Sequence, residues 1–98
     1  MTDFFKDAMI TRHVIVKGRV QGVFFRDYTQ RQALHYALTG WVRNLPDGSV
    51  ETRICGKKEV VTAMLSWLKK GSPQSRVDTI IVTDINVNEK FSSFEIRY

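Results

Sequence analysis

Two short segments of the chain contain the residue types that phosphate chemistry uses. The first is the stretch 18–26, GRVQGVFFR, in which two glycines four positions apart precede Arg26. Such glycines let the backbone turn tightly and direct several N–H groups toward one point. The guanidinium of Arg26 adds a fork of donors that matches the geometry of a phosphate. Together these features could form a cradle for one phosphate group.

An ordinary tight turn with a surface arginine is the competing interpretation of segment 18–26. Glycine-containing turns between a strand and a helix are common, so the residues alone leave both interpretations open. If a helix follows, its unpaired N–H groups and its dipole would favour an anion at the same point. The segment lacks the GxxxxGK[ST] spacing of a nucleotide-binding P-loop.

The second segment, GWVRN at 40–44, ends in Asn44 and is followed by the turn signal Pro46-Asp47-Gly48. A side-chain amide can accept one hydrogen bond while donating another, so Asn44 could hold a water molecule. It cannot act as a strong base. Taken alone, Asn44 is more simply interpreted as a residue that caps the turn.

Hydrophobic periodicity predicts the elements that hold these segments. Apolar and polar residues alternate at about 12–18, 41–45, 50–54, 77–87 and 91–98, which indicates five strands. Apolar residues at helical spacing indicate one helix that runs to about residue 38 and ends at Gly40. They indicate a second helix near 60–70 that ends at Gly71.

This order of elements predicts an α+β, ferredoxin-like βαββαβ sandwich with an extra C-terminal strand. Right-handed crossovers put both helices on one face of a mostly antiparallel sheet, with the first and third strands in the centre. The C-terminal end of the first strand then lies near the second strand, so the two segments could meet. We expect one domain over residues 11–98, preceded by an N-terminal extension over 1–10.

Composition narrows the class of protein. The only cysteine, Cys55, excludes an intramolecular disulfide and suits a reducing compartment. No stretch approaches the roughly 18 apolar residues of a membrane helix, and the first residues lack the pattern of a signal peptide. We therefore expect a cytoplasmic protein that does not contact membranes.

The formal charge of +5 is concentrated in one part of the chain. Residues 12–58 contain nine basic and three acidic side chains, and both segments lie there. This excess suits an anionic partner, which could be a nucleic acid or a single phosphate, or it is only a solvated basic face. No metal site is expected, because His13 and His35 form no ligand pattern with Cys55 or with carboxylates. Cys55 itself is expected to be a packed residue.

Both segments resemble the two signatures of the acylphosphatase family. The residues that carry the resemblance are Gly18, Val20, Gln21, Gly22, Val23, Phe25 and Arg26 in the first, and Gly40, Trp41, Val42, Arg43, Asn44, Gly48, Val50 and Gly56 in the second. Both occur with the spacing of the family, and the similarity runs from about residue 12 to Tyr98.

The resemblance implies a ferredoxin-like enzyme that hydrolyses acyl phosphates to a carboxylate and inorganic phosphate. It implies that Arg26 binds the phosphoryl oxygens, that Asn44 orients the attacking water, and that no metal or other cofactor takes part. The loop donors would be the backbone N–H groups of Gln21, Gly22, Val23, Phe24 and Phe25. The small size favours a monomer whose partners are an acyl phosphate and phosphate.

Two other functions use the same fold. An RNA-binding module would need aromatic residues on its third strand, and 49–54, SVETRI, has none, so we expect no nucleic-acid partner. A non-catalytic phosphate-binding module would not need a residue that positions water, and the presence of Asn44 argues against it.

Overall fold

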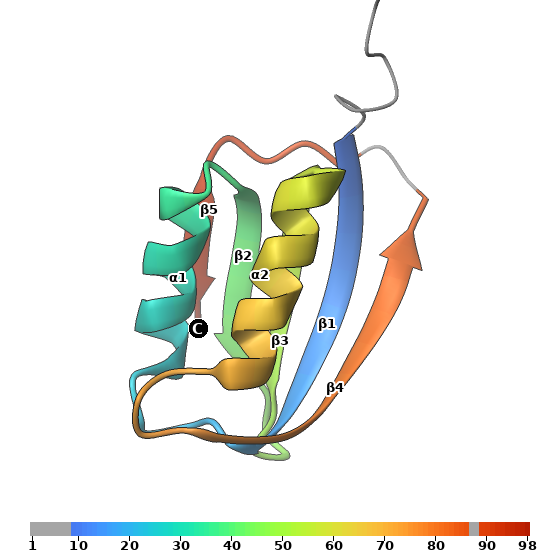
Figure 1. Cartoon of the computed structure of the whole chain (residues 1–98). Coiled ribbons are helices and arrows are strands. Elements are labelled where there is room, and N and C mark those ends of the chain that lie inside the picture. Colours follow the sequence, from blue (N-terminus) through green and yellow to red (C-terminus); the bar gives the residue numbers. More distant parts are fainter. Residues whose placement is uncertain (1–8, 87–88) are drawn as a thin grey trace, which may run out of the picture.

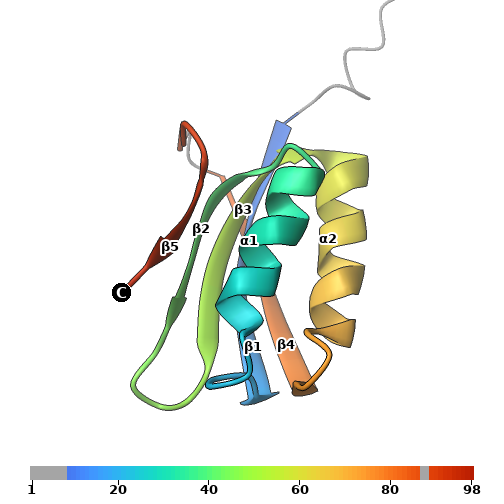
Figure 2. The same ribbon diagram turned by 90° about the vertical axis from the view of Figure 1, so that its left-hand side faces the viewer.

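The computed structural model describes residues 9–86 and 89–98 of the chain. Two helices cover one face of a five-stranded sheet, and the other face of the sheet is open (Figures 1 and 2). The elements follow in the order β1 (Met9–Arg19), α1 (Phe25–His35), β2 (Thr39–Asn44), β3 (Val50–Lys57), α2 (Lys58–Lys70), β4 (Arg76–Ile85) and β5 (Phe94–Arg97).

The strands lie in the order β4-β1-β3-β2-β5. All neighbouring strands pair antiparallel except β2 and β5, which are parallel. The prediction of a ferredoxin-like α+β fold with an added C-terminal strand is therefore confirmed. The added strand β5 brings the C-terminus beside β2 (Figure 2), and Arg26 at the start of α1 donates to the carbonyl oxygen of Arg97 in β5 at 3.4 Å.

The hydrophobic core lies between the helices and the sheet. Val14 and Val16 of β1 are fully buried, as the alternation of their strand predicted. Helix α2 buries Val61, Met64 and Leu68 against the sheet. Because these side chains repeat at helical spacing, the apolar stripe of α2 fixes which of its faces meets the strands.

Strand β1 begins earlier than predicted. It starts at Met9, where the backbone pairs with Lys57 of β3, so Met9 and Ile10 belong to the sheet. The remaining residues of the expected N-terminal extension, 1–8, lie outside the described residues. Strand β5 is shorter than predicted, and β4 ends at Ile85.

The prediction that Gly40 ends the first helix is wrong. Helix α1 ends at His35, and Ala37 takes the left-handed conformation, with φ at +56°, that usually requires glycine. Ala37 N–H donates to the Leu34 carbonyl, and Leu38 N–H donates to the Ala33 carbonyl. These two bonds form the Schellman motif, so an alanine closes this helix.

Gly40 has a different role inside β2. Its φ is +135°, and a Cβ atom placed there would lie 1.9 Å from the carbonyl oxygen of Arg53. Glycine is therefore required because β2 and β3 approach closely at this point, and not because a helix ends.

Candidate active site

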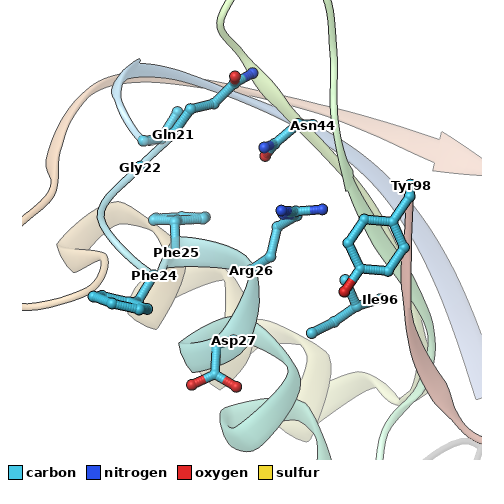
Figure 3. Close-up of a pocket in the computed structure, with 10 residues that line it drawn as sticks. Gln21, Gly22, Phe24, Phe25, Arg26, Asp27, Asn44, Ile96 and Tyr98 are labelled. Carbon is cyan, nitrogen blue, oxygen red and sulfur yellow. The ribbon is translucent and has the colours of Figure 1, made fainter.

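One pocket brings the two segments together. It lies where the β1–α1 loop faces the end of β2, and its volume is about 530 Å³. Six of the seven predicted site residues line it: Gln21, Gly22, Phe24, Phe25, Arg26 and Asn44 (Figure 3). The seventh, Val23, is not in its lining; that side chain is only 5% exposed and packs in the core.

The loop backbone has the form of an anion-binding turn. Gly22 and Phe24 both have positive φ, +75° and +60°, and they flank Val23. Left-handed residues placed in this way turn successive N–H groups toward one concave side of the loop. Helix α1 follows directly, and no side chain caps its first turn. The free N–H groups and the positive end of the helix dipole therefore favour an anion at the loop.

Side-chain hydrogen bonds to distant parts of the chain hold this loop in place. The amide Nε2 of Gln21 donates to the carbonyl oxygens of Leu45 and Ser49, each at 2.8 Å. On the other side, Ser72 Oγ donates to the carbonyl oxygen of Val23 at 3.1 Å, and Ser72 is buried. The loop is thus tied both to the β2–β3 turn and to the α2–β4 connection.

Arg26 stands in the first turn of α1 with its guanidinium in the pocket (Figure 3). One terminal nitrogen donates to the carbonyl oxygen of Arg97 at 3.4 Å, and the guanidinium carbon lies 4.9 Å from the centre of the Tyr98 ring. Within the described residues, no carboxylate forms an ion pair with Arg26. Its positive charge is therefore available to an anionic ligand.

Asn44 is the last residue of β2, and its side chain points toward Arg26 (Figure 3). Its amide oxygen is buried and accepts no hydrogen bond from the described residues. A buried oxygen without a partner is rare, because it has lost its contact with bulk water without compensation. A water molecule or a substrate group that donates to Asn44 would supply the missing hydrogen bond.

The turn after Asn44 is built to be rigid. Asp47 Oδ1 accepts hydrogen bonds from the hydroxyl and the backbone N–H of Ser49, at 2.5 and 3.0 Å. The Ser49 hydroxyl, and then its N–H, hold the pKa of the Asp47 carboxyl below its usual value. Leu45 N–H also donates to the Ser49 carbonyl. This turn fixes the end of β2 that carries Asn44.

His13, Arg43 and Glu51 lie outside the pocket lining. His13 contacts Glu51 at 2.7 Å, and Arg43 donates to the same carboxylate at 2.5 Å. Desolvation is the largest influence and raises the pKa of Glu51, but the bonds from His13 and Arg43 together lower it below its usual value. Cys55 is buried, as predicted. Among residues 9–86 and 89–98, no group of His, Cys, Asp and Glu could hold a metal ion.

Helices α1 and α2 contain 11 and 13 residues. In the described part of the chain, no helix has the length and the apolar composition needed to cross a membrane.

Comparison with known proteins relates this pocket to a family. The family model "Acylphosphatase" matches residues 12–96. An acylphosphatase of Syntrophobacter fumaroxidans is 48% identical over 86 residues, which cover 88% of this chain and 89% of that protein. The solved structure of an acylphosphatase from Coxiella burnetii superposes with a TM-score of 0.89 at 40% identity, covering 99% of this chain and 100% of that chain.

A second solved structure, the acylphosphatase from Bacillus subtilis, gives a TM-score of 0.88 at 39% identity and covers 91% of this chain and 99% of that chain. The matched range contains the β1–α1 loop, Arg26 and Asn44. With a family model across most of its length, the chain belongs to the acylphosphatase family, the hydrolases that act on acyl phosphates.

Proposed function

We propose that the pocket hydrolyses acyl phosphates by attack of water on phosphorus, with the phosphoryl group held by Arg26 and the β1–α1 loop. The observation that carries this proposal is the buried, unpaired oxygen of Asn44, which faces the free cation of Arg26 in one pocket. A cation and backbone donors suit the phosphoryl oxygens, and the unpaired acceptor suits a water molecule.

The chemistry fits a site with few functional groups. The leaving group is a carboxylate whose conjugate acid has a pKa of roughly 4, so it departs without a general acid. Phosphoryl transfer depends mainly on positioning and on stabilisation of negative charge, which Arg26 and the loop donors supply. Water forms the new bond to phosphorus as the bond to the carboxylate oxygen breaks. The water proton passes to a phosphoryl oxygen, giving a carboxylate and inorganic phosphate.

Asp27 is the carboxylate to consider as a rival base, because it lines the same pocket. It forms an ion pair with Arg31 at 2.9 Å, one helical turn farther along α1. In Figure 3 its carboxylate lies on the other side of Arg26 from Asn44. Because Arg31 engages the Asp27 carboxylate and Asn44 lies on the other side of Arg26, we assign the role of proton acceptor to the substrate's own phosphate.

The experiment is hydrolysis of acetyl phosphate in ¹⁸O-labelled water, with and without a metal chelator. We expect turnover that the chelator does not reduce, with the label in inorganic phosphate. Label in the acetate would mean attack on the carbonyl carbon and would overturn the mechanism. Phosphate binding without any turnover would favour the alternative, a non-catalytic phosphate-binding module.

We also propose that the protein acts as a cytoplasmic monomer with no nucleic-acid or membrane partner. Its single cysteine supports a reducing compartment. On β3, the side chains that face away from the helices include Glu51 and Arg53 and no aromatic residue, whereas an RNA-binding sheet stacks bases on aromatic side chains. Gel filtration with light scattering tests the oligomeric state.

A further inference from the structure

We propose that the Phe24 side chain contacts the acyl group of the substrate and gives the enzyme a preference for aromatic acyl phosphates over small ones. This inference rests on the proposed function, because it assumes that phosphate binds at the loop and that Asn44 holds the attacking water.

In-line displacement decides on which side of phosphorus the acyl group lies. The attacking and leaving oxygens stand roughly opposite one another in phosphoryl transfer. With the water at Asn44, the carboxylate must leave on the side of the phosphoryl group that faces away from Asn44. In Figure 3 the Phe24 ring and the Asn44 amide lie at opposite sides of the pocket, with Phe25 and Arg26 drawn between them. Phe24 is therefore the aromatic side chain best placed to meet the leaving group.

The pocket has room for more than a phosphoryl group. Its volume of about 530 Å³ lies within the range of about 300–1,000 Å³ typical of small-molecule sites. Apart from Arg26 and Asn44, its lining includes the apolar side chains of Phe24 and Ile96 and the ring of Tyr98. Such a lining favours an apolar acyl group, since a ring placed against it removes apolar surface from water on both partners.

The conformation of Phe24 supports a functional role for its side chain. Phe24 adopts φ of 60° and ψ of 25°, a left-handed conformation that is unfavourable for a bulky residue, and glycine would adopt it with less strain. Phe24 is 70% exposed, so packing in the core does not compensate for this strain. A ligand that covers the ring would explain why a large apolar side chain stands at this strained position of the pocket.

The experiment compares kcat/KM for benzoyl phosphate and acetyl phosphate in the wild-type protein, Phe24→Ala and Phe24→Gly. We expect the benzoyl-to-acetyl ratio to fall about five- to tenfold in both variants, mainly through KM for benzoyl phosphate. The ratio within each variant cancels changes that affect the phosphate end of both substrates. Leu34→Ala is the matched control, because Leu34 is an exposed apolar residue of α1 outside the pocket lining, and it should leave the ratio unchanged.

The alanine variant separates side-chain contact from backbone strain. Phenylalanine and alanine both carry a Cβ atom, so Phe24→Ala removes the ring and keeps the left-handed strain, whereas Phe24→Gly removes both; an effect of the backbone would therefore appear only in Phe24→Gly. An unchanged ratio in Phe24→Ala, or an equal fall in Leu34→Ala, would overturn the inference. Hydrolysis of both substrates with an unchanged ratio would leave the proposed function intact, whereas no hydrolysis of either by the wild-type protein would contradict the function itself.

Discussion

The chain passes from a strand into a helix twice, and the two connections are built differently. Residues 20–24 separate β1 from α1, and two of them are left-handed. Strand β3 instead runs directly into α2, with Lys57 extended at φ of −63°. Neither helix start has a side-chain cap. A direct connection is therefore sufficient between a strand and a helix of this sheet, and the longer β1–α1 loop agrees with the phosphate cradle proposed above.

The two connections also differ in the side chains that support them. The β1–α1 loop is bonded to two distant parts of the chain: Gln21 of the loop donates to the carbonyls of Leu45 and Ser49, and Ser72 donates to the carbonyl of Val23. A loop with several exposed N–H groups needs such support, since a site for a transition state must be held in its geometry before the substrate arrives. The β3–α2 connection thus shows what the fold requires, and the additional hydrogen bonds of the β1–α1 loop are what the proposed chemistry requires.

The largest effect is expected from the arginine at the start of α1. Arg26→Gln should lower kcat/KM for acetyl phosphate by about 10³-fold, because the main cation that meets the phosphoryl charge is lost. Lys58→Gln is its matched control, since Lys58 is the basic residue at the start of α2. Steady-state kinetics of the two variants checks this. Equal losses would show that general surface charge, and not the cradle, attracts the substrate.

Among the residues that support the loop, Gln21 should show the largest effect when its side chain is lost. In Gln21→Ala the loop loses its two bonds to the β2–β3 turn, so we expect kcat to fall about 10- to 100-fold. Gln30→Ala is the control, because Gln30 also donates from a side-chain amide to a distant carbonyl, that of Phe94 at 3.0 Å. Both should lower the free energy of unfolding by about 1–2 kcal/mol. If kcat falls equally in both, Gln21 has no special role in positioning the loop.

A smaller effect is expected from the loop glycine. A Cβ atom at Gly22 would meet no atom within 4 Å, so Gly22→Ala costs only the strain of its positive φ, about 1 kcal/mol of unfolding free energy. Gly48→Ala should cost about the same, since Gly48 also has a positive φ and open space. Only Gly22→Ala should lower kcat/KM. Urea unfolding and steady-state kinetics of Gly22→Ala and Gly48→Ala test this prediction. An unchanged kcat/KM in Gly22→Ala would show that the loop backbone does not bind the phosphoryl group.

The smallest effect is expected at the other end of α1. Ala37→Gly should raise the free energy of unfolding by about 0.5–1 kcal/mol, because glycine adopts the left-handed closing conformation without steric cost. Helix α2 already closes with Gly71 at φ of 79°. Thermal unfolding measures the change, and a destabilised variant would show that the Ala37 side chain has a packing role.

Features that repeat along the chain could be predicted from the sequence. Local periodicity predicts burial at Val14 and Val16 of β1 and along the stripe from Val61 to Leu68 of α2. The structure confirms that these residues are buried. The two glycine-rich segments were likewise visible as candidates for one site. Their juxtaposition followed from the order of elements, because a right-handed split βαβ brings those strand ends together.

Features that depend on contacts between distant residues could not be predicted. Local spacing predicts that Gly40 ends a helix, whereas glycine is required there because β2 passes the Arg53 carbonyl, a contact set by strand register. The bonds of Gln21 and Ser72 to distant carbonyls had no local signal either. The left-handed backbone of Phe24 was also missed, since a phenylalanine there is an exception to local preference.

Phosphate binding by Asn44→Ala tests whether the loop and Arg26 bind the phosphoryl group while Asn44 acts on the water. Calorimetric titration with inorganic phosphate should give a Kd within about threefold of the wild-type value, while kcat of the same variant falls at least about 100-fold. That result would show that the loop and Arg26 bind the phosphoryl group and that Asn44 acts on the water. Loss of phosphate binding in the folded variant would show that Asn44 itself binds the phosphoryl group, and retention of kcat would show that Asn44 does not act on the water. Either result would contradict the proposed roles.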